Sequence, residues 1–122
     1  MRRISLAALA GLLAVGVAAP AVAQDAAKGA DVYQDRCGSC HVLNGIGQGP
    51  SLVGVVGRKA GSLPGFNYSD AIKASGLTWT AANLDRFLTG PTKLVPGTAM
   101  RAVVADPTER REVIAYLASL KP

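Results

Sequence analysis

Two cysteines and one histidine lie close enough together to suggest a specific chemistry. Cys37 and Cys40 are the only cysteines in the chain, and its single histidine, His41, follows the second one directly. Cys-x-x-Cys-His is the spacing of covalent haem attachment, in which each thiol adds to one haem vinyl group. The adjacent histidine can then reach the iron as an axial ligand. We therefore predict one haem c bound through Cys37 and Cys40, with His41 on its iron.

Other uses of two cysteines fit this sequence less well. A disulfide within Cys-x-x-Cys closes a very short loop and adds little stability. A thioredoxin-like redox motif needs a βαβ pattern around it, and the chain shows no strand alternation. A zinc site needs four ligands, whereas two cysteines and one histidine supply three. A haem-free thiol oxidoreductase is kept as an alternative class.

Met100 is the candidate for the second axial ligand. It is the only methionine besides Met1, and it ends the loop segment Val95–Met100 instead of lying on a helical stripe. A thioether is a soft ligand suited to iron, and His/Met ligation raises the haem potential. The alternative is the usual role of methionine as a flexible core residue. With both axial positions filled, no site remains for oxygen or substrate, so we predict an electron carrier and not an enzyme.

The N-terminal segment has the three parts of a secretory signal peptide. Arg2 and Arg3 are basic, residues 4–19 are almost wholly apolar, and small residues occupy 21–23. The apolar part has 16 residues, short of the roughly 20 that a membrane-spanning helix needs. We predict that residues 1–23 are cleaved off after Ala23 and that the mature protein is periplasmic. An uncleaved membrane anchor is the alternative.

The mature chain would be a single small domain, residues 24–122. Loss of two arginines with the leader lowers the net charge from +5 to +3. That basic density is below what a nucleic-acid binder shows, so no nucleic-acid partner is expected. We expect a monomer.

An all-α fold of about four helices joined by long loops should position these ligands. Ser69, Thr80 and Asp106 are of the residue types that cap helix N-termini. Pro107 just after Asp106 strengthens the last of these caps. The expected helices cover residues 25–37, 70–74, 81–89 and 107–120.

The loops are unusually long for so small a domain, which suggests that a cofactor supplies part of the core. Residues 44–57 carry a glycine every few positions and no run of charge. Such a backbone can pass close to a large rigid surface, because glycine has no side chain to keep it away. We predict that this segment passes along the haem.

Several ordered motifs resemble class I cytochromes c, the branch that contains mitochondrial cytochrome c and its bacterial periplasmic relatives. The resemblance runs from about Ala27 to Leu120, nearly the whole mature chain. It implies that the first and last helices cross near Gly29 and Tyr33. The matching segments are Cys37–His41, Gly49–Leu52, Gly57–Lys59, Pro64–Ser69, Gly76–Trp79, Val95–Met100 and Ile114–Leu117.

The resemblance also implies a set of residues around the haem. The Pro50 carbonyl would accept the ring N–H of His41, making the iron-facing nitrogen a better donor. Tyr68 and Trp79 would hydrogen-bond the propionates, although both could also serve as packing aromatics. Arg58 would offset the propionate charge, and Thr98 would lie on the methionine side. The full cofactor set is Cys37, Cys40, His41, Pro50, Arg58, Tyr68, Trp79, Thr98 and Met100, with His41 and Met100 on the iron.

The methionine side departs from the mitochondrial pattern at three positions. Phe87 stands where relatives usually carry a tyrosine beside the sulfur, and phenylalanine cannot donate to sulfur. Ile72 stands where relatives often have an asparagine that touches a buried water. Ala102 replaces an aromatic that commonly covers the haem. We expect a drier, less hydrogen-bonded methionine side.

The docking edge also differs from the family. Thr92 and Ala99 replace two of the usual lysines, while Arg36, Lys93 and Arg101 remain. We expect a weakly basic docking face with moderate salt dependence; the alternative is ordinary solvated surface charge.

The resemblance implies transient docking to membrane redox complexes, such as a cytochrome bc-type complex, a terminal oxidase or a photosynthetic reaction centre. The expected function is a soluble one-electron carrier between such complexes. Two alternatives remain. One is a carrier dedicated to a periplasmic dehydrogenase, and the other is a haem sensor whose Met100 can be displaced.

Overall fold

A computed structural model describes residues 11, 13–17 and 20–122. Residues 1–10, 12 and 18–19, which belong to the predicted signal peptide, lie outside this range. The described residues form five α-helices and no named strand, with one isolated antiparallel bridge between Lys59 and Thr78. The predicted all-α class is confirmed, with one helix more than the expected four.

The helices are short except for the first and the last. Each predicted N-cap is present: Ser69 Oγ accepts from the Ile72 N–H at 3.2 Å, and Thr80 Oγ1 from the Asn83 N–H at 3.1 Å. Asp106 accepts from two backbone N–H groups of the last helix. The helices are α1 (Ala21–Arg36), α2 (Asp70–Ala74), α3 (Ala81–Thr89), α4 (Pro91–Leu94) and α5 (Pro107–Ser119).

The helices differ from the sequence prediction mainly at the start of α1 and in the extra helix α4; α1 and α5 each end one residue earlier than expected. Helix α1 begins at Ala21, four residues earlier than expected, after Pro20, which makes no side-chain cap. Helix α4 was not expected, because Gly90 and Pro91 predict the end of a helix. Gly90 does end α3, since its N–H donates to the Arg86 and Phe87 carbonyls. Pro91 then begins α4, because proline is well tolerated in the first position of a helix.

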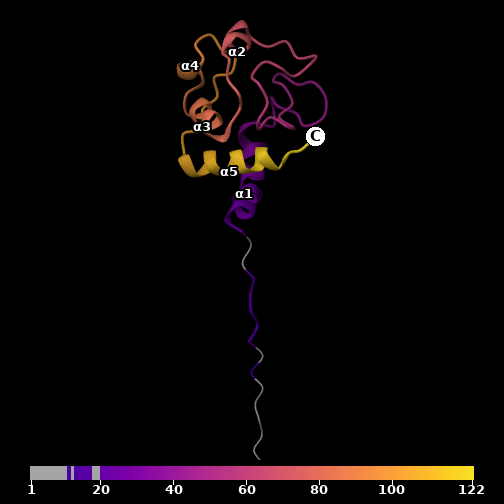
Figure 1. Ribbon diagram of the computed structural model, residues 1–122, viewed down its shortest axis with the longest axis vertical. Coiled ribbons are helices and arrows are strands. Elements are labelled where there is room, and N and C mark those ends of the chain that lie inside the picture. Colours follow the sequence, from indigo (N-terminus) through magenta and orange to yellow (C-terminus); the bar gives the residue numbers. More distant parts are fainter. Residues whose placement is uncertain (1–10, 12, 18–19) are drawn as a thin grey trace, which may run out of the picture.

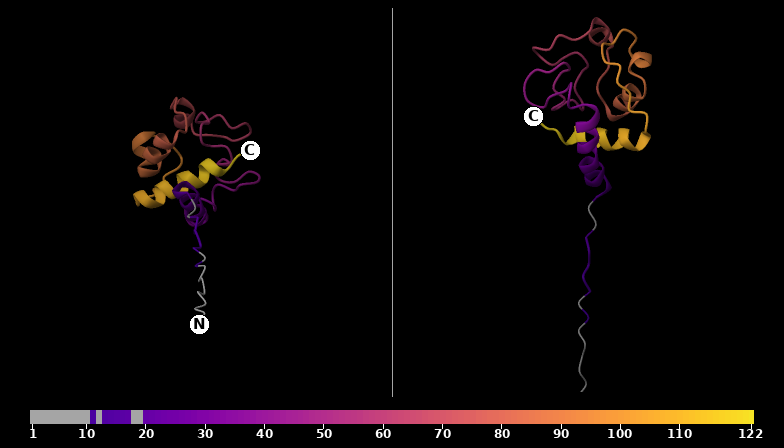
Figure 2. Two further views of the ribbon diagram at one scale, coloured as in Figure 1. Left: turned by 60° about the horizontal axis from the view of Figure 1, so that its bottom comes forward. Right: turned by 180° about the vertical axis from the view of Figure 1, so that it is seen from behind.

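The two long helices cross each other and support the rest of the domain (Figures 1 and 2). A Cβ atom added to Gly29 would lie 2.8 Å from Tyr116 Cβ and closer still to the Glu112 carbonyl oxygen. Only glycine therefore allows the helices to approach this closely. The Tyr33 and Tyr116 rings pack beside the crossing, with centroids 5.4 Å apart. The predicted crossing at Gly29 is confirmed.

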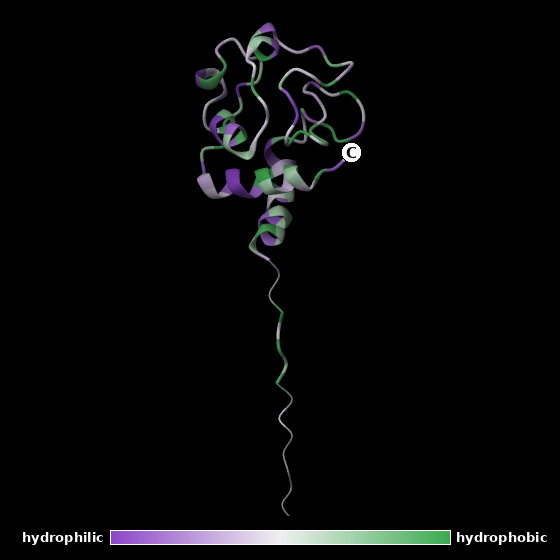
Figure 3. Ribbon diagram, in the orientation of Figure 1, coloured by the Kyte–Doolittle hydropathy of each residue, from purple (hydrophilic) through white to green (hydrophobic). Residues whose placement is uncertain are grey.

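One hydrophobic core includes residues of the helix crossing and of the loops. Val113 of α5 is fully buried, and the same core includes Val55 and Ala60 from the long loop between α1 and α2. In Figure 3, α5 is hydrophilic where it begins and more hydrophobic further along. No helix among the described residues is long and apolar enough to cross a membrane.

Candidate haem site

The Cys-x-x-Cys-His motif lies directly after α1. Cys37 follows the last residue of that helix, and its N–H donates to the Tyr33 carbonyl at 2.8 Å. The Cys40 and His41 N–H groups both donate back to the Cys37 carbonyl, at 3.1 and 2.9 Å. This turn fixes both cysteines and the histidine relative to the end of α1.

Both cysteines are free thiols, as thioether formation requires. Cys37 is buried, and burial raises the pKa of its thiol, with Arg36 opposing the shift. Cys40 is half-buried and donates from Sγ to Gln48 Oε1 at 3.3 Å. Sequence reasoning did not identify Gln48, because it lies eight residues away in a loop without a regular pattern.

The His41 ring is held by the glycine-rich loop. His41 Nδ1 lies 2.8 Å from the Pro50 carbonyl oxygen, which can only accept, so Nδ1 carries the proton. Nε2 therefore keeps its lone pair and is the nitrogen available to a metal. A Cβ atom on Gly49 would lie 2.5 Å from His41 Cε1, so the ring packs directly on the backbone there.

Tyr33 holds the backbone of the same histidine. Its hydroxyl donates to the His41 carbonyl oxygen across eight residues of sequence. Burial, followed by the neighbouring Cys37 and Tyr116, raises the pKa of Tyr33, which keeps the hydroxyl protonated as a donor. Sequence reasoning assigned Tyr33 only to helix packing, because a hydrogen bond to a distant carbonyl leaves no pattern in the sequence.

Met100 and Thr98 lie on the loop between α4 and α5. Met100 is half-buried and packs against the core that contains Cys37 and Trp79. Thr98 is 5 % exposed, and its Oγ1 has no hydrogen-bond partner among the described residues. A buried, unpaired hydroxyl is costly. A haem propionate would provide the missing partner.

The two aromatic residues of the expected propionate cluster both touch the core. Trp79 is 8 % exposed and packs against Phe87, with ring centroids 4.9 Å apart. The Tyr68 hydroxyl accepts from the Leu63 N–H at 3.2 Å, which leaves its own proton free to donate. The Tyr68 and Phe66 rings also pack edge to face, with centroids 4.8 Å apart.

Arg58 forms hydrogen bonds that stabilise the long loop between α1 and α2. Its guanidinium donates to the Ser51 carbonyl at 2.9 Å and to the Val53 carbonyl at 3.3 Å. These bonds fix the segment just after Pro50 and therefore support the position of His41. The positive charge remains, and it can still offset negative charge nearby.

The three expected docking cations are in different situations. Lys93 and Arg101 are exposed and take part in none of the ion pairs between described residues. Arg36 is paired, with Nη2 3.1 Å from Glu109 Oε2. Its charge is therefore partly offset by the Glu109 carboxylate.

The residues present fit a covalently bound haem. Two free thiols precede His41, whose Nε2 is available to a metal. The loop between α4 and α5 adds the Met100 thioether and the unpaired Thr98 hydroxyl. The donor set, nitrogen and thioether sulfur, is one that haem iron accepts.

Comparisons with known proteins also indicate a protein with covalently bound haem. Residues 26–121 match the cytochrome c family. The chain is 46 % identical over 123 residues to cytochrome c2 of Rhodomicrobium vannielii, covering 98 % of this chain and 97 % of that protein. It is 40 % identical to cytochrome c of Euglena viridis, covering 80 % of this chain and 98 % of that protein. The solved structure of cytochrome cH from Methylobacterium extorquens superposes with a TM-score of 0.74 at 45 % identity, covering 78 % of this chain and 98 % of that one.

An all-helical domain with free thiols and a histidine in this arrangement defines a c-type haem protein. The chain belongs to the cytochrome c family. Members of this family bind haem c covalently and transfer electrons instead of catalysing a reaction. The predicted family, cofactor and electron-transfer class are confirmed.

Proposed function

We propose that this protein is a periplasmic one-electron carrier whose haem c is attached to Cys37 and Cys40 and ligated by His41 and Met100. When bound, the haem supplies a one-electron couple between ferric and ferrous iron. The observation that supports the proposal best is the 2.8 Å contact between His41 Nδ1 and the Pro50 oxygen. That contact selects the tautomer whose Nε2 can bind iron.

The remaining site residues hold the cofactor and exclude water. Thr98, Tyr68 and Trp79 would donate to the propionates, which would give the buried Thr98 hydroxyl a partner. Arg58 offsets propionate charge while it fixes the loop behind His41. Phe87, buried against Trp79, keeps the methionine side apolar.

A visible spectrum of the holoprotein tests the ligand assignment. We expect the oxidised protein to show the charge-transfer band of a methionine–iron bond, and Met100→Ala to abolish it and to allow rapid carbon monoxide binding when reduced. Val103→Ala is the control, because Val103 is exposed in the same loop. The assignment is wrong if Met100→Ala keeps the band or if the unmodified protein binds carbon monoxide as fast.

We also propose that residues 1–23 are a signal peptide removed on export. Almost the whole chain of cytochrome cH, 98 %, is covered by only 78 % of this chain, which supports a mature domain without the leader. Cleavage after Ala23 would shorten α1 but keep the Asp25–Arg111 ion pair at 3.2 Å. The intact mass of protein from the periplasm should correspond to a chain starting at Gln24; a mass that includes the leader would favour an anchor.

The electron partners are membrane redox complexes, met transiently. The candidates are a cytochrome bc-type complex, a terminal oxidase and a photosynthetic reaction centre. Lys93 and Arg101 are the exposed cations that would meet them. Rates of electron exchange with each isolated complex would identify the partner, since only the physiological one should approach a rate limited by encounter.

A further inference from the structure

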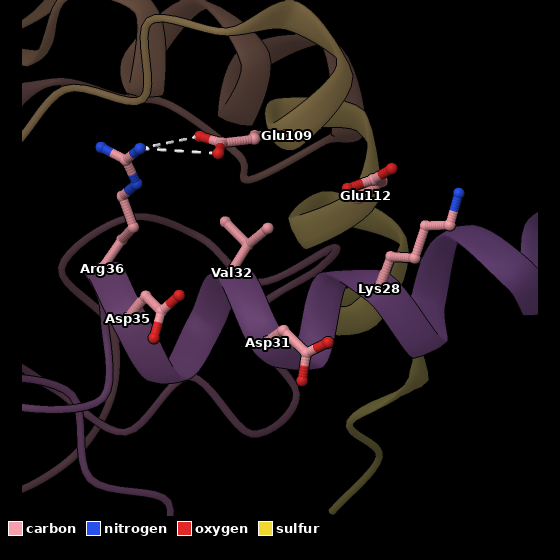
Figure 4. A pocket seen from close by; sticks show the side chains of 7 residues that line it. All are labelled: Lys28, Asp31, Val32, Asp35, Arg36, Glu109 and Glu112. Carbon is pink, nitrogen blue, oxygen red and sulfur yellow. Dashed lines mark hydrogen bonds and ion pairs between the residues drawn. The ribbon is translucent and has the colours of Figure 1, made fainter.

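A groove lies between α1 and the first half of α5. Its volume is about 530 Å³, within the roughly 300–1,000 Å³ range of pockets that hold small ligands. Four of the eight acidic residues of the chain line it. Figure 4 shows Arg36 and Glu109 at one end, and Lys28 and Glu112 at the other. The lining residues are Lys28, Asp31, Val32, Asp35, Arg36, Glu109 and Glu112.

The stability of the fold does not explain the carboxylates on α1. Asp31 and Asp35 are four residues apart on one helix, and like charges at this spacing repel each other. Asp35 also lies in the last turn of α1, where the helix dipole disfavours negative charge. Neither takes part in an ion pair between described residues.

Glu112 is the most unusual of the four acidic residues. It is 9 % exposed, lines the groove, and takes part in none of the hydrogen bonds or ion pairs between described residues. It lies beyond the first turn of α5, so the helix dipole stabilises it little. Lys28 lies at the same end of the groove but forms no ion pair with it. Glu112 is therefore a nearly buried residue whose carboxylate has no protein partner and faces the groove.

We propose that this groove receives a lysine or arginine side chain of the redox partner, with Glu112 as its main acceptor. A cationic side chain would relieve the repulsion among the carboxylates and give Glu112 a charge-assisted hydrogen bond. The groove ends at Arg36, next to the haem anchor Cys37, so a partner docked there would be close to the cofactor. The inference rests on the proposed function only in assigning the side chain to a redox partner.

A metal ion is a poorer occupant than a basic side chain. Over the described part of the chain, no group of three or more His, Cys, Asp or Glu side chains is placed to hold one. The groove is also long and open, with Val32 between its charged ends, which suits an extended side chain with an apolar stem (Figure 4).

Titration with pentalysine, followed by amide shifts of the reduced ¹⁵N-labelled holoprotein, tests the groove. We expect shifts concentrated at residues 28–36 and 109–112, weakening as salt is added. Glu112→Gln and Asp31→Asn should each weaken binding at least about threefold. Asp70→Asn is the matched control, because Asp70 is an exposed carboxylate on α2, paired only with Lys73.

Two results would overturn the proposal at this stage. One is a set of shifts spread over the surface. The other is that Asp70→Asn weakens peptide binding as much as the groove variants do, which would mean that net charge alone governs binding.

Denaturant unfolding adds a second measurement. Glu112→Gln should leave stability unchanged or raise it, because an unpartnered carboxylate is removed; a clear loss would make Glu112 structural.

Electron transfer to a cationic reagent tests the link with redox docking. The rate at which tris(phenanthroline)cobalt(III) oxidises the ferrous protein should be lower for Glu112→Gln and Asp31→Asn than for the unmodified protein. Asp70→Asn should leave this rate unchanged. Equal rates in all three would remove the docking role. Peptide binding does not depend on which residue ligates the iron, so a failed ligand assignment would be visible in the spectrum and not in this titration.

Discussion

Single hydrogen bonds decide how His41 is presented. The ring is oriented by Pro50, and the backbone is held by Tyr33, a residue of the preceding helix. Spacing alone identifies Cys37, Cys40 and His41, because attachment requires them to be adjacent in sequence. Tyr33 and Gln48 could not be predicted, because their contacts depend on how distant segments fold together.

Tyr33→Phe should lower the free energy of unfolding of the holoprotein by about 1 kcal/mol, the usual cost of losing one buried hydrogen bond. The ring packing against Tyr116 would be kept. Tyr116→Phe is the control, since its hydroxyl makes no hydrogen bond to a described residue. Guanidinium unfolding measures both, and equal losses would mean that the Tyr33 hydroxyl contributes nothing specific.

Phe87→Tyr should change the expected methionine side, because it introduces a hydroxyl that Phe87 lacks. Phe87 is 6 % exposed and packs against Trp79, so a new hydroxyl would be buried and would need an acceptor such as the Met100 sulfur. We expect a shifted reduction potential in voltammetry and a changed stability of the methionine–iron bond. If both stay the same, the hypothesis of a drier methionine side is wrong.

At the scale of elements, the helix N-caps could be predicted from the sequence, but two helix starts could not. Ser69, Thr80 and Asp106 mark helix starts because each cap uses residues within three positions. Helix α4 was missed because Gly90 and Pro91 end one helix and begin the next. The early start of α1 follows from alanine, which favours helix without marking a boundary.

Gly29→Ala should destabilise the α1–α5 crossing by about 1–3 kcal/mol, because the added methyl group overlaps the Glu112 carbonyl. Gly90→Ala is a suitable control. Its φ of −166° suits any residue, and a Cβ there would approach Lys93 no closer than 3.4 Å. Thermal unfolding of the two holoproteins separates the effects; a Gly29→Ala melting temperature as high as that of Gly90→Ala would contradict this account.

At the scale of the whole molecule, the acidic residues are unevenly distributed. The chain carries a net charge of +5, yet half of its acidic residues line the α1–α5 groove. Lys93 and Arg101 lie instead on α4 and the loop after it. The family resemblance predicts a weakly basic docking face from Arg36, Lys93 and Arg101. It does not predict the acidic groove, because that grouping depends on how α1 and α5 pack together.

Oxidation by ferricyanide should report the basic part of this surface. Its rate should fall moderately as ionic strength rises, because added salt screens the attraction between an anionic reagent and surface cations. Lys93→Glu and Arg101→Glu should lower the low-salt rate severalfold and flatten the salt dependence. Lys121→Glu makes the same charge change at the exposed C-terminal end, outside the α4–α5 loop. If Lys121→Glu slows the reaction as much, the net charge governs encounter and the basic face has no separate role.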